Sequence, residues 1–283
     1  MNVLLFLFLG LVQGIAEFLP ISSSGHLAIL QNLFNMDYSE TEHLLFDVFL
    51  HLGTLISICV VYRAEIKTML ADGIDYLRKR SDPDLDEPLT LKPPARTLLF
   101  VIVGTLPLII PLFFKDRIEE YLFSSTLFIG FALIITGGLL FVSEKYIKRG
   151  NKTEKTMTFI DAIFIGLAQA VAILPGLSRS GTTITVGLSR GLSGSFAVRF
   201  SLLLSIPAVL GSFIVKLYDA IRHGADFSQF PAYLGGFVVA ALVGFFAIQF
   251  LRRMMANGGF KIFAYYCWGI GALTLVLSLI LKK

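Results

Sequence analysis

The sequence predicts an all-α membrane protein that crosses the bilayer several times and consists of two related halves. Of its 283 residues, 55% are hydrophobic, 26 are phenylalanine and only 16% are charged, and the mean hydropathy is +0.76. This composition is typical of a polytopic membrane protein and not of a soluble domain with a buried core. Two observations support this prediction: six apolar runs are long enough to span a bilayer, and a seventeen-residue motif occurs twice.

The six apolar runs have the length of transmembrane helices, which need roughly 17–25 residues. Three follow the first copy of the repeated motif and three follow the second. We therefore expect one integral membrane domain over residues 1–283, with halves at approximately 1–150 and 151–283. Because three is an odd number of spans, the second half should be inverted relative to the first. The runs are Leu44–Tyr62, Thr97–Phe114, Ser124–Ser143, Phe196–Val215, Tyr233–Phe250 and Ile262–Leu281.

The repeated motif begins at Gly10 and again at Gly166. The first copy is GLVQGIAEFLPISSSGH and the second, 156 positions later, is GLAQAVAILPGLSRSGT, with seven identities in seventeen positions. In each copy an apolar segment leads to a proline and then to a turn rich in serine and glycine. A backbone that breaks inside a membrane must be buried in protein or line a wet cavity. The two copies thus predict re-entrant helix–loop–helix segments, flanked by the short apolar pieces Val3–Leu19, Leu27–Phe34, Phe159–Leu174 and Thr182–Leu192.

Broken helices at corresponding positions of two halves indicate a binding site at the repeat interface. Close helix packing would also explain the small residues. It would not explain why the first copy holds Glu17 and His26 while the second holds Arg179.

The distribution of lysine and arginine predicts the orientation. Segments 63–96, 144–157 and 252–261 carry 15 Lys and Arg residues, whereas the alternating connections carry 6. The basic set should be cytoplasmic. The first re-entrant loop then enters from outside and the second from the cytoplasm, so that their tips can meet near the midplane. The acidic stretch Ser81–Pro94 is expected to be a surface connector, and Cys59 and Cys267, each within an apolar run, to be core residues.

Glu17 is the residue of the first copy that most strongly indicates function. A charge at the bilayer centre costs at least ~2.5–3.5 kcal/mol, so a buried carboxylate needs a partner or a proton. Gln13 lies four residues earlier, on the same side of a helix. A serine beside a base is the minimal arrangement for an activated nucleophile. The polar residues that follow Pro20 are Ser22, Ser23, Ser24 and His26. A structural role could also explain some of them: one serine could cap a helix, and the histidine could be buried with a hydrogen bond.

The second copy has the composition of a phosphate site, although it contains no Walker pattern. Its tip, PGLSRSGTT, places glycine and small hydroxyl residues at the start of a helix, where free N–H groups and the helix dipole favour an anion. Arg179 adds a planar fork of donors that matches phosphate. Burial of this chemistry in a membrane suits a lipid phosphate, whose tail can stay among the helices. The further donors are Ser178, Ser180, Thr182 and Thr183.

Other charged residues in or near the apolar runs have structural interpretations. Asp47 and His51, four residues apart, could support His26 or the first tip, but we favour a structural role. Arg190 and Arg199 should pair with an acid or extend to the interface, and Asp161 should interact with a helix dipole. No nucleic-acid-binding motif is present.

Gln13-x-x-x-Glu17, the following PISSSGH and the segment PGLSRSGTT resemble the two signatures of the undecaprenyl-diphosphate phosphatases, the bacitracin-resistance protein family. The similarity extends through FDVFLHLGTL and FSLLLSIPAVLGS. It implies hydrolysis of undecaprenyl diphosphate to the monophosphate, which recycles the lipid carrier of bacterial cell-wall synthesis. It also implies a multi-pass protein of the bacterial cytoplasmic membrane, with an active site open to the extracytoplasmic side, a homodimer and a divalent cation, Mg²⁺ or Ca²⁺.

The resemblance also assigns roles within the motifs. The first family motif is (E/Q)xxxE, and the glutamine at position 13 leaves Glu17 as the single carboxylate for a metal or base role. Ser23 and His26 match the nucleophile candidates, of which we favour Ser23, and Arg179 matches the phosphate-binding arginine.

Two alternatives differ in kind. PxSSSGH also resembles part of the signature of type 2 phosphatidic-acid phosphatases, but no histidine follows Ser178-Arg179 within the next few residues. A lipid-phosphate flippase could use inverted repeats and Arg179 without chemistry. Phosphate release by the purified protein would distinguish an enzyme from a transporter.

Overall fold

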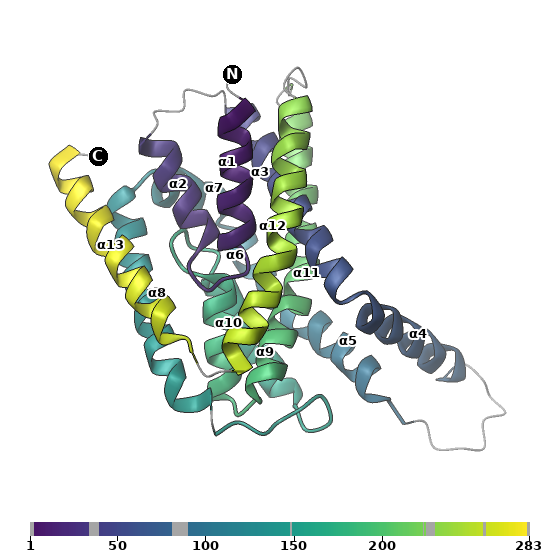
Figure 1. Ribbon diagram of the computed structural model, residues 1–283. Coiled ribbons are helices and arrows are strands. Elements are labelled where there is room, and N and C mark those ends of the chain that lie inside the picture. Colours follow the sequence, from purple (N-terminus) through teal and green to yellow (C-terminus); the bar gives the residue numbers. More distant parts are fainter. Residues whose placement is uncertain are drawn as a thin grey trace.

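The computed structural model describes residues 3–33, 40–80, 90–147, 149–222, 224, 230–256 and 259–281, and within them the chain is helical apart from turns and one isolated bridge between Lys152 and Leu192 (Figure 1). An all-α membrane fold is confirmed. The inverted relation of the two halves stays a prediction.

The first half begins with the broken segment and continues through three long apolar stretches. Its helices are α1 (Val3–Ala16), α2 (Ser23–Leu33), α3 (Glu40–Val61), α4 (Arg63–Arg80), α5 (Pro93–Thr105), the 3₁₀ turn η1 (Leu106–Leu108), α6 (Ile109–Leu112), α7 (Lys115–Ile118), the π-helical turn η2 (Glu119–Phe123) and α8 (Thr126–Ile147). The second half repeats the plan with α9 (Phe159–Val171), α10 (Arg179–Ser189), α11 (Gly194–Arg222), α12 (Phe230–Ala256) and α13 (Lys261–Leu281).

Five stretches within the described residues are long and apolar enough to cross a membrane: Pro93–Leu112, Thr126–Ile147, Gly194–Arg222, Phe230–Ala256 and Lys261–Ile280. A sixth forms if Leu45–Val61 is counted together with Arg63–Arg80, to which it is bent by 77°. These are the six spans that the apolar runs predict.

The segment after the first span is more ordered than expected. The sequence analysis predicts only a cytoplasmic connection from Arg63, whereas α4 is an 18-residue helix that projects sideways from the bundle (Figure 1). It packs against α5 through Gly73, where a Cβ atom would lie 3.0 Å from Leu98. The expected connector Ser81–Pro94 is outside the described residues up to position 89, and α5 already begins at Pro93.

Glycines allow the helices to approach each other closely. A Cβ on Gly10 of α1 would stand 2.5 Å from the carbonyl oxygen of Gly236 in α12, and one on Gly53 of α3 would stand 2.5 Å from that of Phe237. On the other side of the bundle, a Cβ on Gly137 of α8 would stand 2.5 Å from Trp268 of α13. Small residues at helix contacts are typical of membrane bundles.

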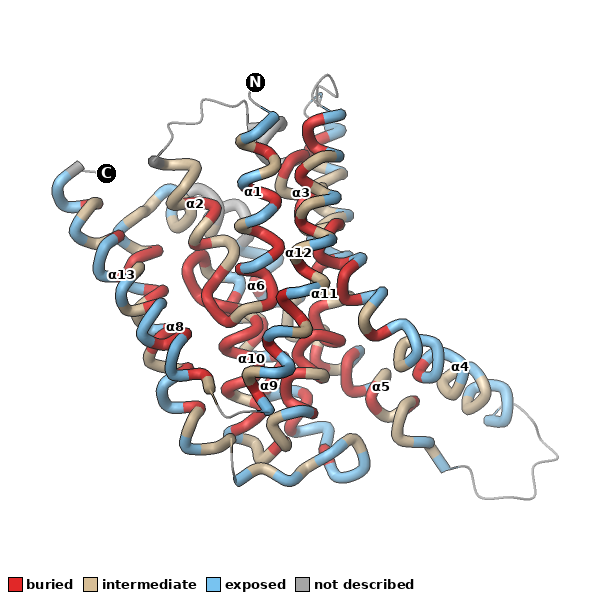
Figure 2. The backbone as a smooth tube through the Cα atoms, in the orientation of Figure 1, coloured by how far each residue is buried: buried red, intermediate tan, exposed pale blue. Residues whose placement is uncertain are grey.

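Burial follows the pattern of a protein surrounded by lipid. Buried residues lie along the inner faces of the helices (Figure 2), and many large apolar residues are exposed, including Phe246 at 67% exposure. Such a surface would be unusual on a soluble monomer. The expectation for cysteines is half right: Cys267 is buried, but Cys59 is exposed on α3.

Candidate active site

The first break in the chain is produced by Pro20 and Ser22. Helix α1 ends at Ala16, and proline at position 20 cannot continue it. Ser22 has a φ of +71°, and its Oγ accepts a hydrogen bond from Gly25 N at 3.2 Å. It therefore caps α2, which confirms the capping role that the sequence allows for one of the serines.

The second break depends on Gly176. Its φ is +89°, and a Cβ there would stand 2.7 Å from Ile129 O, so only glycine fits. Thr136 of α8 stabilises this turn with two hydrogen bonds. Its Oγ1 donates one to Gly176 O and accepts one from Ser178 N, both at 3.1 Å. Ser178 in turn caps α10 by accepting a hydrogen bond from Gly181 N at 3.1 Å.

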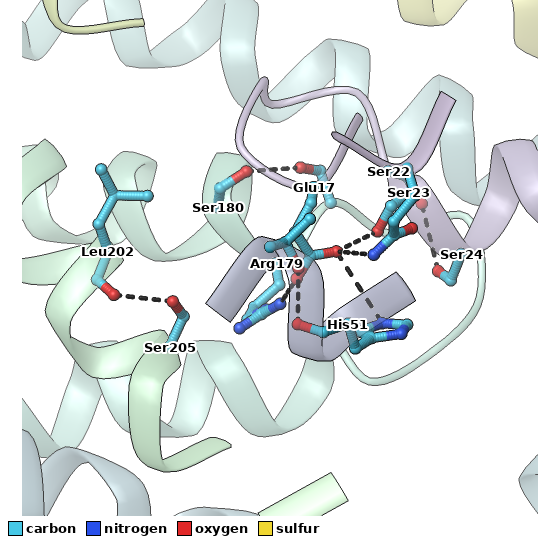
Figure 3. A network of polar contacts seen from close by, with 12 residues as sticks. Glu17, Ser22, Ser23, Ser24, His51, Arg179, Ser180, Leu202 and Ser205 are labelled. Carbon is cyan, nitrogen blue, oxygen red and sulfur yellow. Dashed lines mark hydrogen bonds and ion pairs between the residues drawn. The ribbon is translucent and has the colours of Figure 1, made fainter. Parts of the chain in front are cut away.

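The two tips meet, as the sequence predicts. A Cβ on Gly25 would stand 3.0 Å from Gly176 Cα, and one on Gly181 would stand 3.2 Å from Pro20 Cβ. Ser180 Oγ donates to Leu19 O at 3.4 Å across the same contact (Figure 3).

Glu17 is the centre of the polar cluster between the tips (Figure 3). Its Oε2 accepts hydrogen bonds from Ser23 Oγ at 2.6 Å and from Gln13 Nε2 at 3.1 Å, while Oε1 forms an ion pair with Arg179 Nη2. His51 Nε2 lies 4.0 Å from Oε2. Glu17 is only 7% exposed, so these contacts take the place of the water that a carboxylate requires.

Two buried polar atoms beside the Glu17 carboxylate can still form a hydrogen bond. Arg179 Nη1 and Gln13 Oε1 have no hydrogen-bond partner among the described residues. A buried unsatisfied polar group is costly and needs an explanation. The cluster can therefore offer one more donor to an oxyanion and one more acceptor to a cation.

His26 is engaged elsewhere. Its Nδ1 lies 2.7 Å from Ser22 O, and its Nε2 lies 2.8 Å from the hydroxyl of Tyr266 on α13, on which its ring stacks. Both ring nitrogens thus have partners, and neither partner is Glu17. The interpretation of His26 as a hydrogen-bonded histidine accounts for this geometry.

His51 is the residue that the sequence analysis undervalues. Asp47, four residues earlier, has its carboxylate 3.5 Å from Lys216 Nζ. Asp47 and His51 therefore have different partners and do not act as a pair. His51 approaches Glu17 and does not contact His26. Only its spacing from Asp47 within an apolar run indicated a function.

Among the other residues that we expect to contact the substrate, some have hydroxyl groups that already form hydrogen bonds within the protein and one does not. Thr183 Oγ1 donates to Arg179 O at 2.8 Å and pairs with Ser201 Oγ at 2.6 Å, while Ser24 Oγ is 3.5 Å from Ser22 Oγ and Ser178 Oγ is 3.3 Å from Ser180 Oγ. Thr182 Oγ1 is buried without a partner in the described part of the chain. Contact of these residues with substrate stays a prediction.

The side chains around Glu17 offer a hard cation oxygen ligands that include a single carboxylate. Within the described ranges no group of three His, Cys, Asp or Glu side chains could hold a metal ion. The oxygen donors present are the Glu17 carboxylate, the unpartnered Gln13 Oε1 and Ser23 Oγ. Mg²⁺ and Ca²⁺ prefer oxygen ligands, and Mg²⁺ retains several waters, so a site with one carboxylate fits such an ion.

A second buried carboxylate, Asp161, has a structural role. It forms a capping box with Thr158 at the start of α9, and its oxygens accept from Lys152 Nζ at 2.8 Å and Arg190 Nε at 2.9 Å. This confirms the expected interaction with a helix start and gives Arg190 its acid partner. The cluster ties the loop before α9 to the end of α10.

Comparison with known proteins gives a consistent result over the whole chain. The family model "Bacitracin resistance protein BacA" matches residues 6–273. A protein of Carboxydothermus hydrogenoformans named undecaprenyl-diphosphatase is 40% identical over 281 residues, covering 98% of both chains. Proteins with the same name from Halothermothrix orenii and Methanosphaera stadtmanae are each 37% identical, covering 98% and 99% of this chain and 99% and 100% of their own.

Proposed function

This chain belongs to the bacitracin resistance protein BacA family, and we propose from that membership and from its site that it is an undecaprenyl-diphosphatase. It is a membrane-embedded lipid pyrophosphatase that hydrolyses undecaprenyl diphosphate to undecaprenyl phosphate and inorganic phosphate. The observation that carries the assignment to this site is the 2.6 Å contact between Ser23 Oγ and a carboxylate that also pairs with Arg179 of the other tip.

Ser23 is the proposed nucleophile. Glu17 Oε2 accepts the proton of the Ser23 hydroxyl while Oγ attacks the terminal phosphorus, and the bond to the bridging oxygen breaks. Undecaprenyl phosphate leaves with that oxygen and takes the proton from Glu17, which is ionised again, while the phosphoryl group remains on Ser23. Glu17 then deprotonates a water molecule that attacks the same phosphorus; the bond from phosphorus to Ser23 Oγ breaks, phosphate is released, and Glu17 returns the proton to Oγ.

Arg179 is the proposed phosphate-binding residue. Its Nη1 is the buried donor without a partner, and its planar fork matches two phosphate oxygens. Phosphoryl transfer depends mainly on positioning and on stabilising charge. The capped start of α10 adds backbone N–H groups directed at the same region.

We further propose that a divalent cation, Mg²⁺ or Ca²⁺, assists the reaction. Glu17 and the free Gln13 Oε1 are the side chains of this chain that would hold it. When bound, it would supply positive charge that neutralises diphosphate oxygens.

The proposed setting is the bacterial cytoplasmic membrane, with the site open to the extracytoplasmic side, and with two chains forming a homodimer. Support for the orientation comes from the concentration of lysine and arginine in segments 63–96, 144–157 and 252–261. Neither a flippase nor a type 2 phosphatidic-acid phosphatase is favoured, because the family model covers residues 6–273 and the relatives are named as diphosphatases.

The nucleophile can be tested by acid quenching the purified protein during turnover of substrate labelled on the terminal phosphate. We expect label on the peptide that contains Ser23, and none in Ser23→Ala. A single turnover in ¹⁸O-water that places the isotope in phosphate without labelled protein would replace Ser23 by water as the nucleophile.

A further inference from the structure

A cavity of about 680 Å³ lies at the end of the bundle where α3 bends into α4. Its walls come from that bend, from the loop before α9, from the start of α11 and from the end of α12. It lies at a different level from the active site. Gly244 of α12 touches Phe18, next to Glu17, and Arg252 of the cavity is eight residues further along the helix, which corresponds to about 12 Å.

The lining contains three arginines. Arg199, Arg252 and Arg253 face two acids, Glu65 and Glu154, which leaves the lining net positive. One of the acids is already committed, because Glu154 Oε2 accepts a hydrogen bond from Arg199 Nη2 at 2.5 Å.

The other two arginines are available for a ligand. Arg252 lies over the ring of Tyr62, 5.8 Å from its centroid, an arrangement that positions the guanidinium while leaving its N–H groups free. Arg252 and Arg253 are both exposed, and neither has an ion-pair partner within the ranges that the structure describes. Arginine matches phosphate geometry with two parallel hydrogen bonds.

The remaining polar groups of the cavity also favour an anion. Helix α11 begins at Gly194, and Ser193 and Ser195 line the cavity at this start, where a helix has free N–H groups and the positive end of its dipole. Thr153 adds a third hydroxyl from the facing loop. Phe196, Val198 and Met255 give the same space an apolar wall.

We infer that this cavity is a second phosphate-binding site, distinct from the active site, which takes the phosphate group of an anionic lipid. It opens at the end of the molecule that carries the basic segments, where the headgroups of the cytoplasmic leaflet would lie in the proposed orientation. Basic pockets between membrane helices on that side bind anionic headgroups. An apolar wall beside the arginines suits a headgroup with attached chains better than it suits free phosphate.

The experiment measures thermal unfolding of the purified full chain in neutral detergent, titrated with dihexanoyl phosphatidylglycerol, dihexanoyl phosphatidylcholine or inorganic phosphate. The variant is Arg252→Gln/Arg253→Gln. The matched control is Lys145→Gln/Arg149→Gln, which removes the same charge from exposed positions that do not line the cavity. A ligand that binds the folded state raises the unfolding temperature.

We expect the phosphatidylglycerol concentration for half-maximal stabilisation to rise about tenfold in the cavity variant and to stay unchanged in the control. Phosphatidylcholine should have no arginine-dependent effect. If inorganic phosphate gives the same arginine-dependent stabilisation at equal concentration, the ligand of this site is soluble phosphate. An equal response of the wild type, the cavity variant and the control to both anions would overturn the site.

A second variant addresses the case in which the arginine variant does not fold. Ser195→Glu places an acid in the first turn of α11, where it favours the helix dipole. This variant should unfold at an unchanged or higher temperature without ligand, and should lose the response to phosphatidylglycerol. A retained response would contradict the inference. Hydrolysis of undecaprenyl diphosphate in neutral detergent should remain unchanged in both variants, so the outcome is independent of the proposed catalytic residues.

Discussion

Glu17 and Arg179 form an ion pair across 162 positions of sequence, with one partner in each copy of the repeated motif. Each residue stands at the tip of a broken helix. Glu17 also accepts a hydrogen bond from the Ser23 hydroxyl, and Arg179 has a second donor, Nη1, that has no partner among the described residues. The pair therefore connects the proposed base to the proposed phosphate site.

Arg179→Lys should fold normally and lose much of its turnover, and Arg179→Ala should lose more, about 10²–10³ in rate. A lysine is a point charge on a flexible stem and does not reproduce the fork. Phosphate release and melting temperature are measured on both variants.

The competing role for Arg179 is simple neutralisation of Glu17. In that case Arg179→Ala would be unstable, and adding Glu17→Gln would restore its melting temperature.

Glu17→Gln alone should abolish most activity while the protein stays folded, because the amide cannot accept the Ser23 proton.

Ser23→Ala should be about as inactive as Glu17→Gln, whereas Ser24→Ala should retain most turnover. Ser24 is the matched control, since its Oγ lies 3.5 Å from Ser22 Oγ, whereas among the described serines it is Ser23 that contacts Glu17. Near-normal phosphate release by Ser23→Ala would move the nucleophile to His26 or water.

Tyr266→Phe should lower the melting temperature because it removes the 2.8 Å contact between α2 and α13, and His26→Ala should lower it further because it also removes the Nδ1 contact with Ser22 O and the ring stacking. Loss of a hydrogen bond of this kind costs about 1 kcal/mol. If His26 is instead the nucleophile, His26→Ala will be inactive but stable, and Tyr266→Phe will turn over substrate.

Gln13→Glu should lower the Mg²⁺ concentration needed for half-maximal phosphate release. The change adds a carboxylate one helical turn from Glu17, and Mg²⁺ prefers charged oxygen ligands. The wild-type protein, with its isosteric glutamine, is the reference, and phosphate release after treatment with a chelator gives the rate without added metal. An unchanged Mg²⁺ dependence would remove position 13 from the metal site.

Cysteines at Arg80 and Tyr121, placed in a chain with Cys59 and Cys267 replaced, should label oppositely with an impermeant reagent in intact cells. Both positions are exposed. Position 121 should react from outside and position 80 only after permeabilisation. The reverse pattern would overturn the proposed orientation and place the arginine cavity in the outer leaflet.

The sequence was a good guide to the spans, because the length of an apolar run is a direct physical requirement of the bilayer. It also predicted the contact of the tips, since broken helices at corresponding positions of two halves indicate a site at the repeat interface. It did not predict α4, which packs against α5 at Gly73 and buries Met69 but contains no apolar run of spanning length.

The parts of the site that sequence reasoning missed come from tertiary packing. His51 reaches Glu17 because α3 packs against α12, where Gly53 lies against Phe237. The contact of His26 with Tyr266 joins residues 240 positions apart. The spacing of Asp47 and His51 within an apolar run only suggested support for the first tip, and nothing in the sequence pairs His26 with Tyr266, so the fold is needed to identify both partners.

The division of the charge pair between the two repeats has a consequence for biosynthesis. Glu17 emerges from the ribosome 162 residues before its partner, which at ordinary elongation rates is a delay of roughly 8–30 s. During that time the acid has no arginine to balance it. The first broken helix must therefore either wait at the membrane surface or carry a proton on Glu17 until the second half has been inserted.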